Sequence, residues 1–349
     1  MKTLRLHLHT WGAKLRRTGG LFEVTNVTAK GKVVQTRTFA AAAVRSIQLN
    51  EGTTVSADAV RLALENDVDL IFQDRRGMPI GRVTSPRLGS TARTRRGQLR
   101  LAEHPEGLRR TRDWLVQKID AQQEVLAAVP SRSQSVAFCK QLTKTQKQLD
   151  KQRRKLQRLD FTQSLADLRA RTRGLEGTAA RSYFAALGAA PPKPFRFARR
   201  SRRPAVDAFN AALNYGYGML YGYVERSLLR AGLSPYIGFL HRDDYRYKAL
   251  VYDFIEPYRP AVDATVLQCF RRGQLTADDF APGVDSGGGI LIGMAGRKRL
   301  ADAVDKRLCV QTQSYRQQRH TLEHQLQLEA HTLATFCAEF VTDGAETTS

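Results

Sequence analysis

The sequence predicts an α+β, multidomain protein in which a small N-terminal β-rich domain precedes a mainly α-helical domain. Alternating apolar and polar residues, typical of half-buried strands, are confined to about the first 85 residues. A stretch rich in Gly, Ser, Thr and Arg follows, and helical periodicity dominates after it. The length of 349 residues also favours two domains. We expect a β-rich domain at 1–88, a linker at 89–106, a helical domain at 107–341 and a frayed tail at 342–349.

The first elements are predicted as strands. Leu4, Leu6 and Leu8 alternate with polar residues, and residues 21–28 and 32–39 repeat the pattern on either side of a turn at 29–31. Ser56 is placed to cap a short helix that reaches Asn66. A buried strand at 68–72 and a turn at 75–77 lead into a last strand at 78–83.

The rest of the chain is predicted to be helical. Leu142, Leu149 and Leu156 recur every seven residues, which indicates a helix packed on a neighbour. The prolines of segment 191–204 exclude a single helix and predict a loop. Further helical patterns cover residues 206–231, begin again near Leu250, and extend from Arg297 to Phe340.

The charge of the chain points to a polyanionic partner. It has 56 Lys and Arg against 33 Asp and Glu, a formal net charge of +23. Such an excess repels itself unless a polyanion compensates it, and nucleic acid is the commonest such partner. No apolar run of about 18 residues and no signal-peptide core is present, which argues against membrane insertion. The four cysteines form no C-x-x-C pair, so we expect a reducing, cytoplasmic location without disulfides.

One acid stands out among basic residues. Segment 169–203 contains ten Lys or Arg and a single carboxylate, Glu176. An acid where phosphates dock weakens binding unless a cation lies between them, so metal ligation is one reason for its presence. The alternative is an ion pair within the helix, with Arg173 or Arg181.

A second group of candidate ligands follows. His241 ends the apolar run 236–240, where it is placed either to bind a metal or to serve as a cap. Asp253 and Glu256 share one face if their segment is helical, and they need a cation or an Arg such as Arg259 between them. One imidazole with two or three carboxylates suits Mg²⁺ or Mn²⁺.

Four motifs together resemble one protein family. Residues 174–184 (GLEGTAARSYF) match the pattern E-G-x-A-A-x-x-Y-F of the CRISPR-associated spacer-acquisition integrases. Residues 210–225 (NAALNYGYGMLYGYVE), 231–241 (AGLSPYIGFLH) and 253–260 (DFIEPYRP) are similar to further motifs of that family, in the same order. The resemblance covers most of residues 1–310.

This resemblance implies specific roles. Glu176, His241 and Glu256 are expected to bind Mg²⁺ or Mn²⁺, and Asp253 is expected to be an auxiliary catalytic acid near the metal. The N-terminal domain is expected to form a homodimer, which works with a small ferredoxin-like partner. The implied activity is insertion of short DNA into a repeat array by attack of a 3′-hydroxyl on a phosphodiester, with endonuclease action as the related reaction. Glu256 departs from members that have Asp there, and the basic stretch 109–158 is longer than usual.

Basic residues near these motifs are predicted to contact DNA, and no other cofactor is expected. They are Arg173, Arg181, Arg199, Arg200, Arg202, Arg203, Arg297, Lys298 and Arg299. Two alternatives stay open at this point: a transposase of a mobile element with the same fold, and a DNA-binding scaffold without catalysis.

Overall fold

The structure of the protein is a computed structural model that describes residues 4–28, 32–74, 79–83, 91–129, 136–241, 247–283 and 288–340. The chain divides into two compact units, Met1–Leu88 and Gly89–Ser349. The first is built mainly of strands and the second mainly of helices, which confirms the predicted fold class. The predicted turns at 29–31 and 75–77 and the predicted tail at 342–349 lie outside the described residues.

The N-terminal unit contains two four-stranded sheets and one helix. One sheet has the strand order β1-β5-β7-β8, and the other has the order β4-β3-β2-β6. Their bounds are β1 Leu4–Leu8, β2 Lys14–Thr18, β3 Leu21–Val27, β4 Val33–Ala40, β5 Val44–Asn50, β6 Thr54–Val55, β7 Asp69–Gln73 and β8 Pro79–Val83. Helix α1, Ala57–Glu65, is capped by the Ser56 side chain as predicted.

Strand β5 was missed by the sequence analysis. It pairs in parallel with both β1 and β7, and it is buried along most of its length, including Arg45 and Ser46. Because buried Arg45 and Ser46 stand at its start, only its last four residues alternate between apolar and polar, which is a short signal for a strand.

The C-terminal unit is a helical body. Its helices are α2 Thr91–Ala102, α3 Pro105–Ala127, α4 Val136–Gln157, α5 Leu165–Leu187, η2 Lys193–Phe195, α6 Ala208–Arg230, α7 Ala249–Phe254, η3 Glu256–Tyr258, α8 Arg259–Arg271, η4 Ala277–Asp279, α9 Met294–Asp305, η5 Lys306–Val310 and α10 Leu322–Glu339. Two short hairpins, β9 Phe280–Pro282 with β10 Ile290–Ile292 and β11 Thr312–Tyr315 with β12 Gln318–Thr321, complete it. None of the helices described is long and apolar enough to cross a bilayer.

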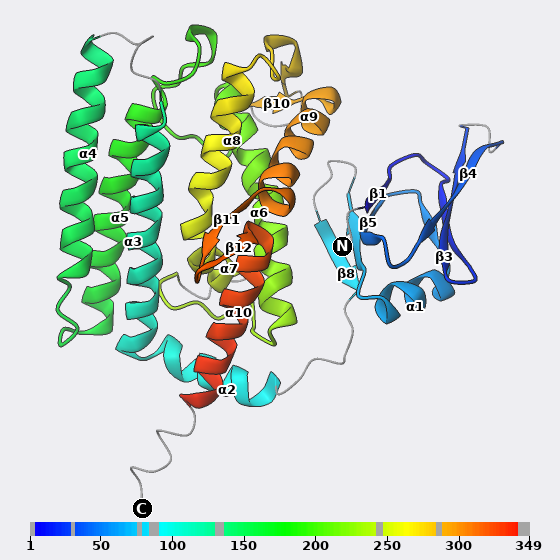
Figure 1. Ribbon diagram of the computed structural model, residues 1–349, viewed down its shortest axis with the longest axis horizontal. Helices are drawn as coiled ribbons and strands as arrows, with labels where there is room; N and C mark the ends of the chain where they lie inside the picture. The colour runs from blue at the N-terminus through cyan, green and yellow to red at the C-terminus, as the bar shows by residue number, and fades with distance from the viewer. Residues whose placement is uncertain are drawn as a thin grey trace, which may run out of the picture. The chain divides into compact units, whose positions relative to one another are not determined.

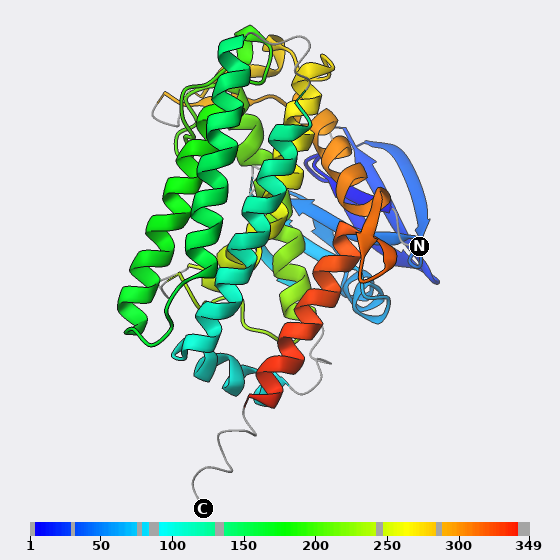
Figure 2. The same ribbon diagram turned by 60° about the vertical axis from the view of Figure 1, so that its left-hand side comes forward.

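Helices α3, α4 and α5 lie side by side along much of their length (Figure 1 and Figure 2). The heptad residues Leu149 and Leu156 of α4 are fully buried, and Leu142 is half-buried against the same core. The predicted packing of this helix on neighbours is therefore confirmed.

The predicted linker at 89–106 differs from the structure, because helix α2 occupies most of it. Thr94, Gly97, Gln98 and Leu101 form a buried stripe at helical spacing. A Cβ at Gly97 would lie 1.6 Å from the carbonyl oxygen of Cys337, so glycine permits α2 to cross α10 closely. The local composition suggested a linker. The contact that explains Gly97 could not be recognised from it, because Cys337 is more than 200 residues away in the sequence.

The predicted helix over 297–340 is also wrong as a single element. The β11–β12 hairpin interrupts it, with positive φ angles of 47° at Arg316 and 65° at Gln317 in the two-residue turn. Two consecutive positive φ angles are typical of tight hairpin turns, and neither residue is the glycine or asparagine that signals such a turn in a sequence.

A buried carboxylate joins three helices of this unit. The hydroxyls of Tyr183 on α5 and Tyr217 on α6 both donate to Asp263 on α8, the former over 2.9 Å. Burial raises the pKa of Asp263 to about 6, although both tyrosine hydrogen bonds act in the opposite direction. The folded protein therefore binds a proton here more tightly than the unfolded chain does.

This proton linkage predicts a pH-dependent stability. Because the pKa of Asp263 is raised on folding, its contribution to stability is greatest at low pH and is lost as the pH passes through about 6. The free energy of unfolding, measured with urea and taken relative to that of Asp263→Asn, should fall by roughly 2 kcal/mol between about pH 4 and pH 7. A difference between the two proteins that does not change with pH would contradict this.

Candidate metal centre

Glu176 lies in the middle of helix α5, and its partner comes from another helix. Its Oε1 is 2.5 Å from Nζ of Lys118 on α3, and its side chain is 31% exposed. The sequence suggested an ion pair of Glu176 with Arg173 or Arg181 in the same helix. The structure instead shows an ion pair with Lys118, which is 58 positions away in the sequence and lies on another helix. Glu176 therefore stands at the accessible side of the cluster.

Glu256 forms an ion pair with the same lysine. Its Oε2 is 2.6 Å from Nζ of Lys118, and its Oε1 is 2.8 Å from Nε of Arg259. The Arg259 guanidinium also donates to the Tyr221 hydroxyl over 2.9 Å, which fixes its direction. Glu176 Oε1 and Glu256 Oε2 are both within 2.6 Å of the same nitrogen atom. The distance between the two oxygens therefore cannot exceed twice 2.6 Å.

Lys118 was missed by the sequence analysis, although a signal was present. It occupies the buried face of α3 with Trp114, Leu115, Ile119 and Gln122. A lysine on such a face requires anionic partners, since a buried unpaired charge is costly. Only the fold identifies these partners, because they come from α5 and η3.

Asp253 organises the segment that carries His241. Its side chain is fully buried, and its Oδ2 accepts from the backbone N–H groups of Phe239 over 2.6 Å and Leu240 over 3.0 Å. Its Oδ1 is 2.6 Å from Nδ1 of His241 and also accepts from the backbone N–H of that residue over 3.3 Å. Gly238 makes this approach feasible, since a Cβ there would lie 2.9 Å from Oδ2.

The segment that carries Asp253 and Glu256 is helical, because α7 ends at Phe254, Ile255 keeps a helical backbone and Glu256 begins the 3-10 turn η3. Asp253 pairs with His241, whereas Glu256 pairs with Lys118 and Arg259. Both carboxylates nevertheless act on His241, since each of them raises the pKa of its ring.

The charges of the cluster shift the protonation of its members. Burial alone would raise the pKa of Glu256, but Arg259 and Lys118 outweigh it and hold this pKa below its usual range. Burial alone would lower the pKa of Lys118, and the two glutamates outweigh it and raise this pKa. The pKa of His241 is likewise raised against the effect of burial, mainly by Asp253. Glu256 is therefore ionised and Lys118 charged at neutral pH.

The donor set fits a hard or intermediate divalent cation. Within the described ranges, no three His, Cys, Asp or Glu side chains are close enough to cage a metal by themselves. Two carboxylates nevertheless already converge on one cation, and Glu256 Oε2 is buried without accepting a hydrogen bond of ordinary geometry. Because Asp253 engages Nδ1 of His241, the other ring nitrogen, Nε2, remains to bind a metal.

The basic residues predicted to contact DNA are exposed, apart from the half-buried Arg200 and Arg297. Arg199, Arg202 and Arg203 are exposed, in the segment that precedes α6. This segment is held to α6 because Asn210 and Asn214 donate to its backbone carbonyls over 3.0 and 2.7 Å. These three arginines therefore extend from a fixed backbone. Arg173 and Arg181 on α5 and Lys298 on α9 are also exposed.

The half-buried Arg200 and Arg297 and the exposed Arg299 are engaged by other parts of the protein. The Arg200 guanidinium lies 2.9 Å from Oδ1 of Asn210 and 2.6 Å from Oδ1 of Asn214, and burial lowers its pKa. Arg297 donates to a backbone carbonyl over 2.8 Å, and Arg299 donates to another over 2.8 Å and pairs with Asp279. Their guanidiniums hold neighbouring segments together.

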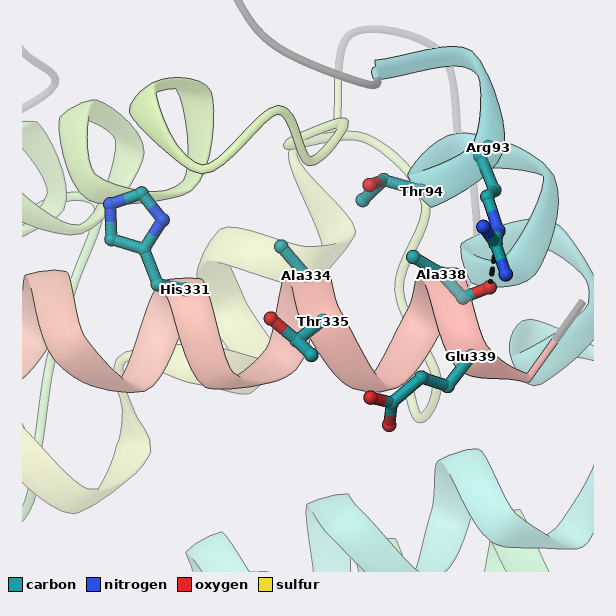
Figure 3. Close-up of a pocket in the computed structure, with 7 residues that line it drawn as sticks. All are labelled: Arg93, Thr94, His331, Ala334, Thr335, Ala338 and Glu339. Atoms are coloured by element: carbon teal, nitrogen blue, oxygen red, sulfur yellow. Dashed lines mark hydrogen bonds between the residues drawn. The ribbon is translucent and has the colours of Figure 1, made fainter.

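The described surface also has a shallow pocket of about 300 Å³ between α2 and α10. It is lined by Arg93, Thr94, His331, Ala334, Thr335, Ala338 and Glu339 (Figure 3). Arg93 bridges the two helices by donating to the Ala338 carbonyl over 3.0 Å. None of the predicted site residues lines this pocket.

Known proteins resemble this chain over most of its length. The model of the family described as CRISPR associated protein Cas1 matches residues 6–306. The chain is 30% identical over 307 residues to the CRISPR-associated endonuclease Cas1 2 of Rhodospirillum rubrum, covering 86% of this chain and 85% of that protein. It is 32% identical over 234 residues to the CRISPR-associated endonuclease Cas1 1 of Archaeoglobus fulgidus, covering 64% and 67%. The matched segment of the Thermus thermophilus relative is shorter, at 43% identity and 43% of that protein's length.

Solved structures share the fold. A casposase bound to integration product superposes with a TM-score of 0.75 at 21% identity, covering 97% of this chain and 91% of that one. A Cas1 protein from Thermotoga maritima superposes with a TM-score of 0.71 at 18% identity, covering 96% and 97%.

The contacts of Asp253 predict that it contributes strongly to stability. Asp253→Asn keeps only one acceptor oxygen, so at least one buried backbone N–H group loses its partner. Hydrogen bonds to a charged acceptor contribute about 1.5–3 kcal/mol each, and we expect a loss of roughly 2–4 kcal/mol in the free energy of unfolding, measured with urea.

Asp302→Asn is the matched control, because Asp302 is exposed on α9. Its effect should stay within about 0.5 kcal/mol. Equal stabilities of the two variants would show that Asp253 does not hold the 239–241 segment.

Proposed function

The chain belongs to the CRISPR-associated Cas1 family, and from that membership we propose that it is a metal-dependent DNA integrase and endonuclease of the cytoplasm. It inserts short DNA fragments into a CRISPR repeat array by attack of a DNA 3′-hydroxyl on a phosphodiester. Its relatives carry the name CRISPR-associated endonuclease, which supports the hydrolytic form of the same reaction.

One observation carries the proposal. Glu176 and Glu256 come from segments 80 residues apart in sequence, and one oxygen of each lies within 2.6 Å of the same cationic nitrogen. Two converging carboxylates, together with the imidazole of His241, whose ring Asp253 holds and whose pKa Glu256 helps to raise, form a donor set that suits Mg²⁺ or Mn²⁺. The proposed ligands are Glu176, His241 and Glu256.

The protein's own residues orient these donors. Arg259 occupies Oε1 of Glu256 and so turns Oε2 toward the cation position. Asp253 holds the ring of His241 through Nδ1 and acts as a positioning residue rather than as a ligand. A bound divalent ion would polarise the phosphodiester and stabilise the leaving oxygen. Exposed arginines on α5 and on the 199–203 segment bind the DNA backbone, because a guanidinium suits a phosphate.

The partners are proposed on the same basis. Two of the solved structures that share the fold are named as complexes of Cas1 with Cas2, and one contains a casposase with its integration product. We propose that this chain acts on DNA as a homodimer with a small ferredoxin-like partner. We also propose that the N-terminal unit forms the contact between the two copies of the chain in this homodimer.

Glu176→Gln tests the catalytic assignment. It removes one anionic ligand while keeping the shape of the side chain, so strand transfer from a short 3′-hydroxyl duplex into a supercoiled target with Mn²⁺ should fall at least about 100-fold. Duplex affinity should stay within about twofold, since the variant adds no negative charge to the surface. Glu124→Gln, at an exposed position on α3, is the control and should leave both quantities unchanged.

Two other outcomes would each favour a different function. Wild-type protein that binds duplex but yields no product with Mg²⁺ or Mn²⁺ would indicate a DNA-binding scaffold. A preference for targets with terminal inverted repeats over a CRISPR repeat array would indicate a transposase, as the shared fold with a casposase suggests.

The position of the arginines predicts the salt dependence of DNA binding. Replacing Arg199, Arg202 and Arg203 together by Ala should reduce the slope of log affinity against log salt by roughly 0.9 for each phosphate that the protein no longer neutralises. Replacing Lys140, Lys144 and Lys147 on α4 removes the same charge from another exposed surface. Equal changes in the two triple variants would attribute binding to net charge rather than to the 199–203 segment.

A further inference from the structure

We propose that Lys118 is a built-in counter-cation that takes the place of the divalent ion in the metal-free protein and competes with it for Glu176 and Glu256. The inference rests on the function proposed above, because it assigns to Lys118 the control of metal affinity at the same site.

The contacts of Lys118 are those of a bridging cation. Its Nζ lies 2.5 Å from Glu176 Oε1 and 2.6 Å from Glu256 Oε2, and its side chain is only 7% exposed. An ammonium group has three donors and no acceptor, and Lys118 donates one hydrogen bond to Glu176 and forms an ion pair with Glu256. The lysine therefore joins α3 to both α5 and η3 through one atom.

The metal-free protein needs such a cation. Two ionised carboxylates repel each other strongly where water is excluded, and Glu256 is 9% exposed. Arg259 contacts only Glu256, and does so through the other oxygen, Oε1. Among the described residues, Lys118 alone forms ion pairs with both Glu176 and Glu256, so its charge offsets the repulsion between the two carboxylates.

The same position makes Lys118 a competitor. A divalent ion such as Mg²⁺ binds carboxylate oxygens at about 2.0–2.1 Å, which is inside the distance that the ammonium now holds. The two cations repel each other and compete for the same two oxygens, so coordination of a metal by both carboxylates would weaken their contacts with Nζ. The four-carbon stem of lysine lets Nζ move while the backbone of α3 stays in place.

The location of Lys118 argues against a purely structural role. It projects from the buried face of α3, beside Trp114 and Leu115, where an apolar residue of similar volume would pack without the cost of burying a charge. The presence of a lysine at this position is explained if its positive charge compensates the negative charges of the two glutamates.

Lys118→Met keeps approximately the length of the side chain and removes its charge. It therefore tests whether Lys118 competes with the metal ion or only stabilises the two glutamates in the metal-free protein. Titration calorimetry with Mn²⁺ on the full chain should give an affinity at least about tenfold tighter than that of the wild type. In EDTA the variant should melt at a lower temperature than the wild type, and saturating Mn²⁺ should raise its melting temperature by more. Lys140→Met, an exposed lysine on α4, is the matched control and should change neither quantity.

The other possible results of the Mn²⁺ titration distinguish failure of this inference from failure of the proposed function. A folded Lys118→Met protein that binds Mn²⁺ no more tightly than the wild type overturns the inference alone, provided that Glu176→Gln still removes binding from the wild type. If neither the wild type nor Lys118→Met shows Mn²⁺ binding that depends on Glu176, the proposed function fails as well. Should Lys118→Met not fold, Lys118→Gln keeps a donor without the charge, and the same two results apply to it.

Discussion

The ion cluster of Lys118, Glu176, Glu256 and Arg259 is the constraint on which the helical unit depends. It joins α3, α5, η3 and the start of α8, and the buried charges of Lys118, Glu256 and Arg259 are not stable there alone. Removing one partner of such a pair costs roughly 3–5 kcal/mol, because it leaves the other charge buried without compensation. Four elements that are distant in sequence therefore have to meet in one arrangement, and the proposed metal ligands are part of it.

Tyr183, Tyr217 and Asp263 provide a second buried polar connection, which joins α5 and α6 to α8. Both buried sites thus involve α5 and α8: Glu176 and Tyr183 are two turns apart on α5, and Arg259 and Asp263 are one turn apart on α8. Packing of apolar side chains surrounds these contacts without specifying their register. The polar groups define which helical faces must oppose each other.

Sequence reasoning was most successful where the signal is local. The helix cap at Ser56, the stripe on α4 and the fold class follow from neighbouring residues, and all agree with the structure. It missed α2 because Gly97 is explained only by its crossing with α10. It missed Lys118 because a lysine identifies no partner until α5 and η3 are placed. The expected position of Asp253 near the metal stays a prediction, and its contacts with the backbone of residues 239–241 could be recognised only in the fold.

The absence of a side chain at Gly238 has a consequence for variation among related sequences. Any β-carbon there would collide with Ala249 and press on the carboxylate of Asp253. Alanine, the mildest of replacements, would thus displace an imidazole three positions further on without touching it. Sequence variation is consequently restricted at position 238, although Gly238 takes no part in the chemistry. What has to be retained there is the space that a β-carbon would fill.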